Sequence, residues 1–206
     1  MTRKRTPASR DATQSPVSSD RRDVLIGAAA LAAGIAGFVP DRSDASTEIE
    51  ENAALRLGDR FEIARGPMKG ELLRADMLTP GEKPVECFPV DAVTGTVRRG
   101  NRLNRTLALK LDPAEMEDAT RALSVDGVLA YSAVCTHKGC TIKSWKDEER
   151  ILRCHCHLSE FAALDGGRVM KGPAMHQLPM APLGVDDDGF VVATAGFTEE
   201  PGGKTK

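Results

Sequence analysis

The sequence predicts an all-β fold, and three observations support this prediction. Aromatic residues make up 4% of the chain, while glycine (19) and proline (12) are frequent, a composition that suits short strands joined by many turns. Short apolar stretches separated by Gly or Pro recur from residue 61 onward. With 206 residues and 41% hydrophobic content, the chain is long enough for one ordinary domain and a tail.

The apolar stretches are expected to form the strands of this fold. They are Phe61–Ala64, Val85–Val90, Thr106–Leu111, Val128–Val134, Arg150–Cys154, Arg168–Met170 and Phe190–Ala195. The turn at 186–189 is expected to close a hairpin before the last strand. One short helix is also expected, because Asp112 can cap it and Pro113 suits its first position. This helix is expected to end before Gly127, which follows its last apolar residue.

Residues 1–45 have the features of a targeting segment. Arg21 and Arg22 precede an uncharged run at 24–39, which resembles a twin-arginine export signal. The run has 16 residues, fewer than the ~20 that cross a membrane comfortably, so both cleavage and retention as an anchor are open. A buried Ala-rich helix is the alternative. The resemblance implies a periplasmic protein, soluble or anchored to the inner membrane through residues 24–39, in a compartment where disulfides persist.

The rest of the chain divides by composition. Residues 46–60 are polar and acidic and are expected to be a linker or a short helical lead-in. The folded domain is expected at 61–198, followed by a disordered tail at 199–206. The charge is nearly balanced, with 28 Lys and Arg against 30 Asp and Glu, so nucleic acid is not expected as a partner. Residues 98–105 carry four arginines, which form either a docking site for an acidic redox partner or a solvated loop.

The cysteines and histidines gather in two short boxes, at residues 135–140 and 154–159. Four of the five cysteines fall within 22 residues and interleave with three of the four histidines. Each box could offer one thiolate and one imidazole. The candidate ligands are Cys135, His137, Cys154 and His157, spaced as Cys-x-His, sixteen residues, then Cys-x-x-His. A tetrahedral zinc site in a zinc-stabilised binding module is the rival assignment.

The paired boxes resemble those of Rieske [2Fe-2S] proteins, over about residues 128–192. The segment 172–174, Gly-Pro-Ala, with Leu178 and Pro179 is similar to the proline loop of that family. The resemblance implies one [2Fe-2S] cluster, held with one iron on two cysteines and the other on two histidines. It also implies a Rieske-type antiparallel β sandwich with a small cluster-binding subdomain at about 132–180. No catalytic residue is assigned, and whether the chain counts as an enzyme is left open.

The resemblance gives roles to residues beside the ligands. Cys140 and Cys156 are left over and are expected to form a disulfide that clamps the two boxes together. Cys87 is expected to be a buried free thiol. Ser159 is expected to donate a hydrogen bond to the cluster. Phe161 stands where quinol-oxidising members carry a tyrosine hydroxyl, which predicts a lower reduction potential than theirs.

The residues after His157 also bear on the partner. A bulky Leu158, a retained Ser159 and a phenylalanine at 161 resemble the small subunit of arsenite oxidase, which is exported with a twin-arginine signal. This resemblance implies the electron-transfer subunit of an exported oxidoreductase, with a molybdenum-containing large subunit as its redox partner. The alternative is the Rieske subunit of a quinol:cytochrome c reductase, with cytochrome b or c as partner.

Overall fold

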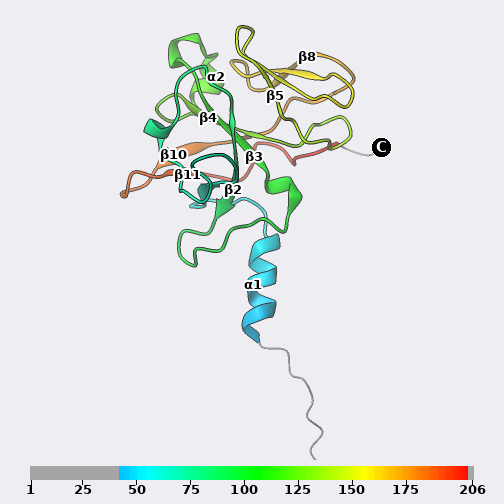
Figure 1. Ribbon diagram of the computed structural model, residues 1–206. Coiled ribbons are helices and arrows are strands. Elements are labelled where there is room, and N and C mark those ends of the chain that lie inside the picture. The colour runs from blue at the N-terminus through cyan, green and yellow to red at the C-terminus, as the bar shows by residue number, and fades with distance from the viewer. Residues whose placement is uncertain (1–41, 204–206) are drawn as a thin grey trace, which may run out of the picture. The chain divides into compact units, whose positions relative to one another are not determined.

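The computed structural model describes residues 42–203 (Figure 1). The twin-arginine segment and the run at 24–39 lie outside the described residues, as do residues 204–206. Within residues 42–203, no helix combines the length and the apolar character that crossing a membrane requires.

The described chain is mostly β, with few and short helices. The strands are β1 (Arg60–Ile63), β2 (Val85–Val90), β3 (Thr106–Lys110), β4 (Val128–Ser132), β5 (Ser144–Lys146), β6 (Ile151–Arg153), β7 (Glu160–Ala162), β8 (Arg168–Lys171), β9 (Met180–Ala181), β10 (Leu183–Val185) and β11 (Val191–Ala193). The helices are α1 (Arg42–Asn52) and α2 (Asp118–Arg121), with 3-10 turns η1 (Ala75–Met77), η2 (Arg102–Asn104) and η3 (Pro113–Glu115).

The strands form two antiparallel sheets. The larger has the order β10-β11-β1-β2-β3-β4-β9, and the smaller has the order β5-β6-β7-β8. Only Pro182 separates β9 from β10, although these strands lie at opposite edges of the larger sheet. This short connection curls the sheet into a barrel-like shape (Figure 1). The predicted all-β antiparallel fold is confirmed.

Two hydrophobic cores lie on opposite sides of β3 and β4, because side chains alternate along a strand. Leu129 and Tyr131 of β4 belong to the core shared with the small sheet, together with Leu152 and Phe161. Val128 and Ala130 belong to the core inside the larger sheet. The small sheet, beside which the candidate site lies, is therefore packed against β3 and β4 of the larger one.

The helix expected after Asp112 is shorter and interrupted. Asp112 does cap, since its side chain accepts a hydrogen bond from the Ala114 backbone N–H at 2.9 Å. However, only the 3-10 turn η3 follows, and α2 begins separately. Met116 is extended, and the backbone N–H of Glu117 donates to the carbonyl of Leu164 at 3.0 Å. Because the Glu117 N–H pairs with the loop at Leu164, it makes no helical hydrogen bond, and the helix is interrupted there.

The helical lead-in at α1 is held to the larger sheet by a buried arginine. Arg98 is fully buried, and all five of its N–H groups find partners. These are the carboxylates of Asp59 and Asp91 and both the carboxylate and the backbone carbonyl of Glu50, at 2.7–3.1 Å. Arg98 therefore has a structural role. Neither interpretation of the arginine run at 98–105, a solvated loop or a docking site, applies to this residue.

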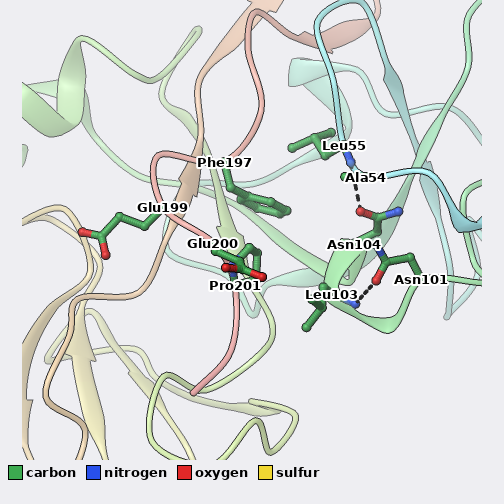
Figure 2. A pocket seen from close by; sticks show the side chains of 9 residues that line it. All are labelled: Ala54, Leu55, Asn101, Leu103, Asn104, Phe197, Glu199, Glu200 and Pro201. Atoms are coloured by element: carbon green, nitrogen blue, oxygen red, sulfur yellow. Dashed lines mark hydrogen bonds between the residues drawn. The ribbon is translucent and has the colours of Figure 1, made fainter. Parts of the chain in front are cut away.

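The C-terminal strap, residues 196–203, also packs on the domain. Its Thr198 backbone N–H donates to the Met180 carbonyl at 2.8 Å. Figure 2 shows the cavity of about 280 Å³ that the strap forms with the segment after α1 and with η2. There the Leu55 N–H donates to Asn104 Oδ1 at 3.0 Å. Residues 199–203 of the expected disordered tail thus lie against other parts of the fold.

Candidate metal centre

The first box is a tight loop between β4 and β5. The Cys135 backbone N–H donates to the Cys140 carbonyl, and the Gly139 N–H donates back to the Cys135 carbonyl, both at 2.9 Å. Gly139 has a φ of +72°, which glycine adopts without strain. These bonds direct the Cys135 side chain inward, where it is 1% exposed, and leave His137 half-buried.

The second box is a loop of the same kind between β6 and β7. The Cys154 backbone N–H donates to the Ser159 carbonyl at 2.9 Å. Cys154 and Ser159 are buried, whereas His155, His157 and Leu158 are exposed. Leu158 has a φ of +61°, an uncommon conformation for a leucine. The loop thus turns one thiol inward and keeps its candidate imidazole at the surface.

A disulfide joins the two boxes. Cys140 and Cys156 are bonded, with Cα atoms 6.6 Å apart. These are the two cysteines that are not expected as cluster ligands from the resemblance to Rieske proteins. The Sγ atoms of Cys140, Cys154 and Cys156 lie within 4.8 Å of one another, but the disulfide removes two of them as metal ligands. Cys135, Cys154 and, as expected, Cys87 are free and buried.

The buried Cys135 thiol is not ionised readily. Burial raises the pKa of the Cys135 thiol to about 11, while hydrogen bonds from the His137 backbone N–H and the Ser159 hydroxyl oppose the rise. Cys154 lies in side-chain hydrogen-bond contact with Cys135 and also raises this pKa. A metal cation bound beside the Cys135 thiol would favour its ionised form.

The two candidate imidazoles meet edge to face. The ring centroids of His137 and His157 are 4.6 Å apart, at an interplanar angle of 85°. Burial, followed by the charges of His157 and Lys138, lowers the pKa of His137. Its Nδ1 atom is buried and has no hydrogen-bond partner within residues 42–203. A neutral imidazole with an unpaired buried nitrogen is suited to bind a metal ion.

The segment that resembles a proline loop closes over both boxes. The Thr136 hydroxyl donates to the His176 carbonyl at 2.7 Å, and the Ala174 backbone N–H donates to Ser159 Oγ at 3.2 Å. Gly172 has a φ of +90°, and a Cβ there would lie 2.6 Å from the Ser159 Cα. Only glycine therefore allows this segment to pack so closely on the second box.

Two further contacts on the first box come from distant parts of the chain. Arg102 Nη1 donates to the Gly139 carbonyl at 3.2 Å. A Cβ on Gly203 of the C-terminal strap would lie 2.5 Å from the His137 carbonyl oxygen. Neither residue was expected in the site from the sequence, because no fixed spacing links Arg102 or Gly203 to the boxes.

The donor set fits a [2Fe-2S] cluster. Two buried thiols and two imidazoles, one of them with an unpaired buried Nδ1, are the donors that a cluster with two cysteine and two histidine ligands takes. The disulfide holds the loops that carry them.

Comparison with known proteins places this site in a known domain class. The family described as "Rieske [2Fe-2S] domain" matches residues 101–182. These residues form a Rieske [2Fe-2S] domain. The cofactor of the chain is accordingly a [2Fe-2S] cluster. The match also weighs against the zinc-stabilised module considered from the sequence.

Relatives of this Rieske domain occur in respiratory complexes. The cytochrome bc1 complex Rieske iron-sulfur subunit of Streptomyces lividans is 40% identical over 98 residues, which cover 47% of this chain and 57% of the relative. A proposed Rieske subunit of a respiratory nitrate reductase from Haloferax mediterranei is 34% identical over 137 residues, covering 65% of this chain and 58% of the relative. The chain thus spans less than two thirds of these curated relatives.

A solved structure is also similar in sequence to the Rieske domain. The soluble domain of the Rieske protein II from Sulfolobus acidocaldarius is 33% identical, covers 34% of this chain and 40% of its own, and has a TM-score of 0.32.

Proposed function

We propose that the protein transfers one electron at a time through its [2Fe-2S] cluster, as the electron-transfer subunit of a larger oxidoreductase. In this proposal Cys135 and Cys154 hold one iron, and His137 and His157 hold the other. The observation that carries it is the convergence of two free buried thiols and two imidazoles on loops joined by the Cys140–Cys156 disulfide. When bound, a cluster of this kind is a one-electron centre with a potential of about −150 to +300 mV.

The residues of the chain orient and shield the ligands. The Ser159 hydroxyl donates toward Cys135 and accepts from the Ala174 N–H, so its proton stays directed at the thiol side of the site. Buried Phe161 and Leu178 exclude water from that side. Such contacts set the potential, because a donor to sulfur stabilises the more negative, reduced state.

The histidine side of the site faces the solvent. His157 is exposed and His137 is half-buried, and Leu158 (47% exposed) and Met175 (79% exposed) are exposed apolar residues on the second box and the proline-loop segment. Exposed apolar side chains around a functional site favour contact with another protein. We propose that electrons enter and leave here, where the path from a docked partner to the imidazoles is shortest.

Spectroscopy and analysis of the purified protein test this function. Electron paramagnetic resonance of the dithionite-reduced protein should give a Rieske-type signal, with two irons and two acid-labile sulfides per chain. Iron-loaded protein without that signal would refute the proposal. Zinc at one equivalent with no sulfide would support the zinc-stabilised module instead.

Two partner assignments follow from different observations. The absence of a hydroxyl at Phe161, together with Leu158, supports the small subunit of an exported oxidoreductase of the arsenite oxidase type, with a molybdenum-containing large subunit. The names of relatives such as that of Streptomyces lividans support a Rieske subunit of a quinol:cytochrome c reductase. Co-purification separates them, since a molybdopterin-containing chain supports the first and a cytochrome b supports the second.

We also propose export of the folded protein to the periplasm by the segment at 1–45, with or without retention of residues 24–39 in the inner membrane. The Arg21-Arg22 pair before an uncharged run and a disulfide typical of oxidising compartments support this. Changing both arginines to lysine should leave the protein in the cytoplasm. Unchanged export of that variant would contradict the proposal.

A further inference from the structure

Two adjoining hollows run along one face of the larger sheet. They have volumes of about 650 Å³ and 420 Å³ and share Arg65, Gly66 and Glu86 in their walls. We call the two together the basic groove, because the charged side chains that line it are mainly cationic. These cations are Arg65, Lys69, Lys83, Arg99, Arg105 and Lys143, and Glu86 is the acidic residue in the walls.

Three of these cations are unpaired. Lys69, Lys83 and Lys143 are exposed and make no ion pair within residues 42–203. Arg99 pairs with Glu62, whereas Arg65 and Arg105 both pair with Glu86. The groove therefore keeps a net positive charge, and such a surface attracts an anionic partner.

The paired arginines indicate which anionic group fits the groove. The Glu86 carboxylate lies between Arg65 Nε at 3.1 Å and Arg105 Nη1 at 3.2 Å, so a carboxylate is already seated there. The floor beneath is apolar and includes Phe88, which is 6% exposed and has the guanidinium carbons of Arg99 and Arg105 each 5.6 Å from its ring centroid. Carboxylates beside apolar side chains are the chemistry of an acidic polypeptide segment.

One end of the groove lies next to the first box. Lys143 and Ile142 line this end, and the Ile142 backbone N–H donates to the Ala133 carbonyl at 2.7 Å. Ala133 lies two residues before Cys135, and Ile142 lies two residues after Cys140. A chain seated in the groove is thereby brought beside the loop that carries His137.

We propose that the basic groove docks an acidic, partly apolar segment of the redox partner protein. The proposal rests on the proposed function only for the redox nature of that partner. A polypeptide fits better than a membrane surface, because the cations surround a concave groove with an apolar floor, whereas lipid headgroups present a flat surface to a protein. The proposed docking surface includes Arg99 and Arg105, two of the four arginines in the run at 98–105.

Charge reversal of the unpaired lysines tests the docking. The groove variant combines Lys69→Glu, Lys83→Glu and Lys143→Glu. The control variant reverses three cations that line neither hollow, Arg121→Glu, Arg168→Glu and Lys171→Glu. The full-length, cluster-loaded proteins are titrated at about 50 mM salt into a fluorescein-labelled decaglutamate peptide, with binding read by fluorescence anisotropy. Sedimentation with vesicles of phosphatidylglycerol and phosphatidylcholine is measured in parallel.

The groove variant should bind the peptide about tenfold more weakly than the unchanged protein, while the control variant stays within about twofold. Equal losses in the two variants, or no binding of the peptide by the unchanged protein, would overturn the proposal. A groove variant that loses vesicle binding more than peptide binding would overturn it in favour of a lipid surface. Each protein is also checked by electron paramagnetic resonance. If the Rieske signal is missing but the groove variant still binds the peptide more weakly than the control variant does, the proposed function is refuted and the docking surface is supported.

Discussion

Ser159 and Ala174 link the second box to the proline-loop segment, because the Ala174 backbone N–H donates to Ser159 Oγ at 3.2 Å. The Ser159 hydroxyl is also in hydrogen-bond contact with the Cys135 thiol. The side chain of Ser159 thus contacts both the proline-loop segment and a candidate ligand thiol.

Replacing Ser159 by alanine should lower the reduction potential. The variant removes a donor that stabilises the reduced cluster by about 1–2 kcal/mol, which corresponds to about 50–100 mV for one electron. A redox titration monitored by electron paramagnetic resonance measures the shift. Threonine at this position keeps the hydroxyl and serves as the control, and an unchanged potential in the alanine variant would contradict this role.

Replacing Phe161 by tyrosine should act in the opposite direction. Phe161 is fully buried in β7, so a hydroxyl added there would be shielded from water and could donate toward the cluster. We expect the potential to rise by up to about 100 mV in the same titration. The control is Tyr131→Phe, which removes the buried hydroxyl that donates to the Ala163 carbonyl at 2.8 Å instead of adding one. A lower potential in Phe161→Tyr would refute the expectation.

Removing the disulfide should lower the stability of the fold and speed the loss of the cluster. Cys140 and Cys156 close a loop with a sequence separation of 16, and a cross-link of this size contributes about 3 kcal/mol to the free energy of unfolding. Replacing both cysteines by serine should lower the midpoint of urea unfolding and speed the loss of cluster absorbance. Cys87→Ser, at a free thiol outside the boxes, controls for the loss of a cysteine. A double variant that retains its cluster as long as the unchanged protein would contradict this.

Asp91 should make the stability depend on pH. Hydrogen bonds from the Thr94 backbone N–H and then from the Arg56 side chain hold the pKa of Asp91 well below its ordinary value. Because the folded pKa lies below the unfolded value of about 3.9, the stabilisation is full above pH 4 to 5 and is lost as the pH falls below that range.

Urea unfolding of the unchanged protein and of Asp91→Asn measures this effect. The difference in unfolding free energy between them should be largest near pH 6 and should shrink toward pH 3. Asp187→Asn, at an exposed position of the turn at 186–189, is the control. A difference between the two proteins that does not change with pH would exclude the role of this carboxylate.

Local signals in the sequence predicted most of the fold and much of the candidate site. The expected strand at Val85–Val90 coincides with β2, and the other expected strands overlap β1, β3, β4, β6, β8 and β11. The short strands β5, β7 and β9 were missed. The boxes were recognisable because their cysteines and histidines have a fixed local spacing.

Contacts between distant segments could not be predicted in this way. The interruption at Glu117 depends on Leu164, and the contact of Arg102 with Gly139 joins residues 37 apart in sequence. The burial of Arg98 was also hidden, because the surrounding arginines give it the appearance of a surface residue. Its acceptors come from three separate segments, which only the folded chain brings together.

The bonds of Arg98 also limit how the domain can move. Since Arg98 holds the backbone carbonyl and the carboxylate of Glu50, the end of α1 is fixed to the larger sheet just before residues 53–60. Because the buried Arg98 also binds Asp59 and Asp91, residues 53–60 are held at both ends and do not provide a free hinge. An electron carrier that must swing between its donor and its acceptor would therefore have to turn as one body together with α1.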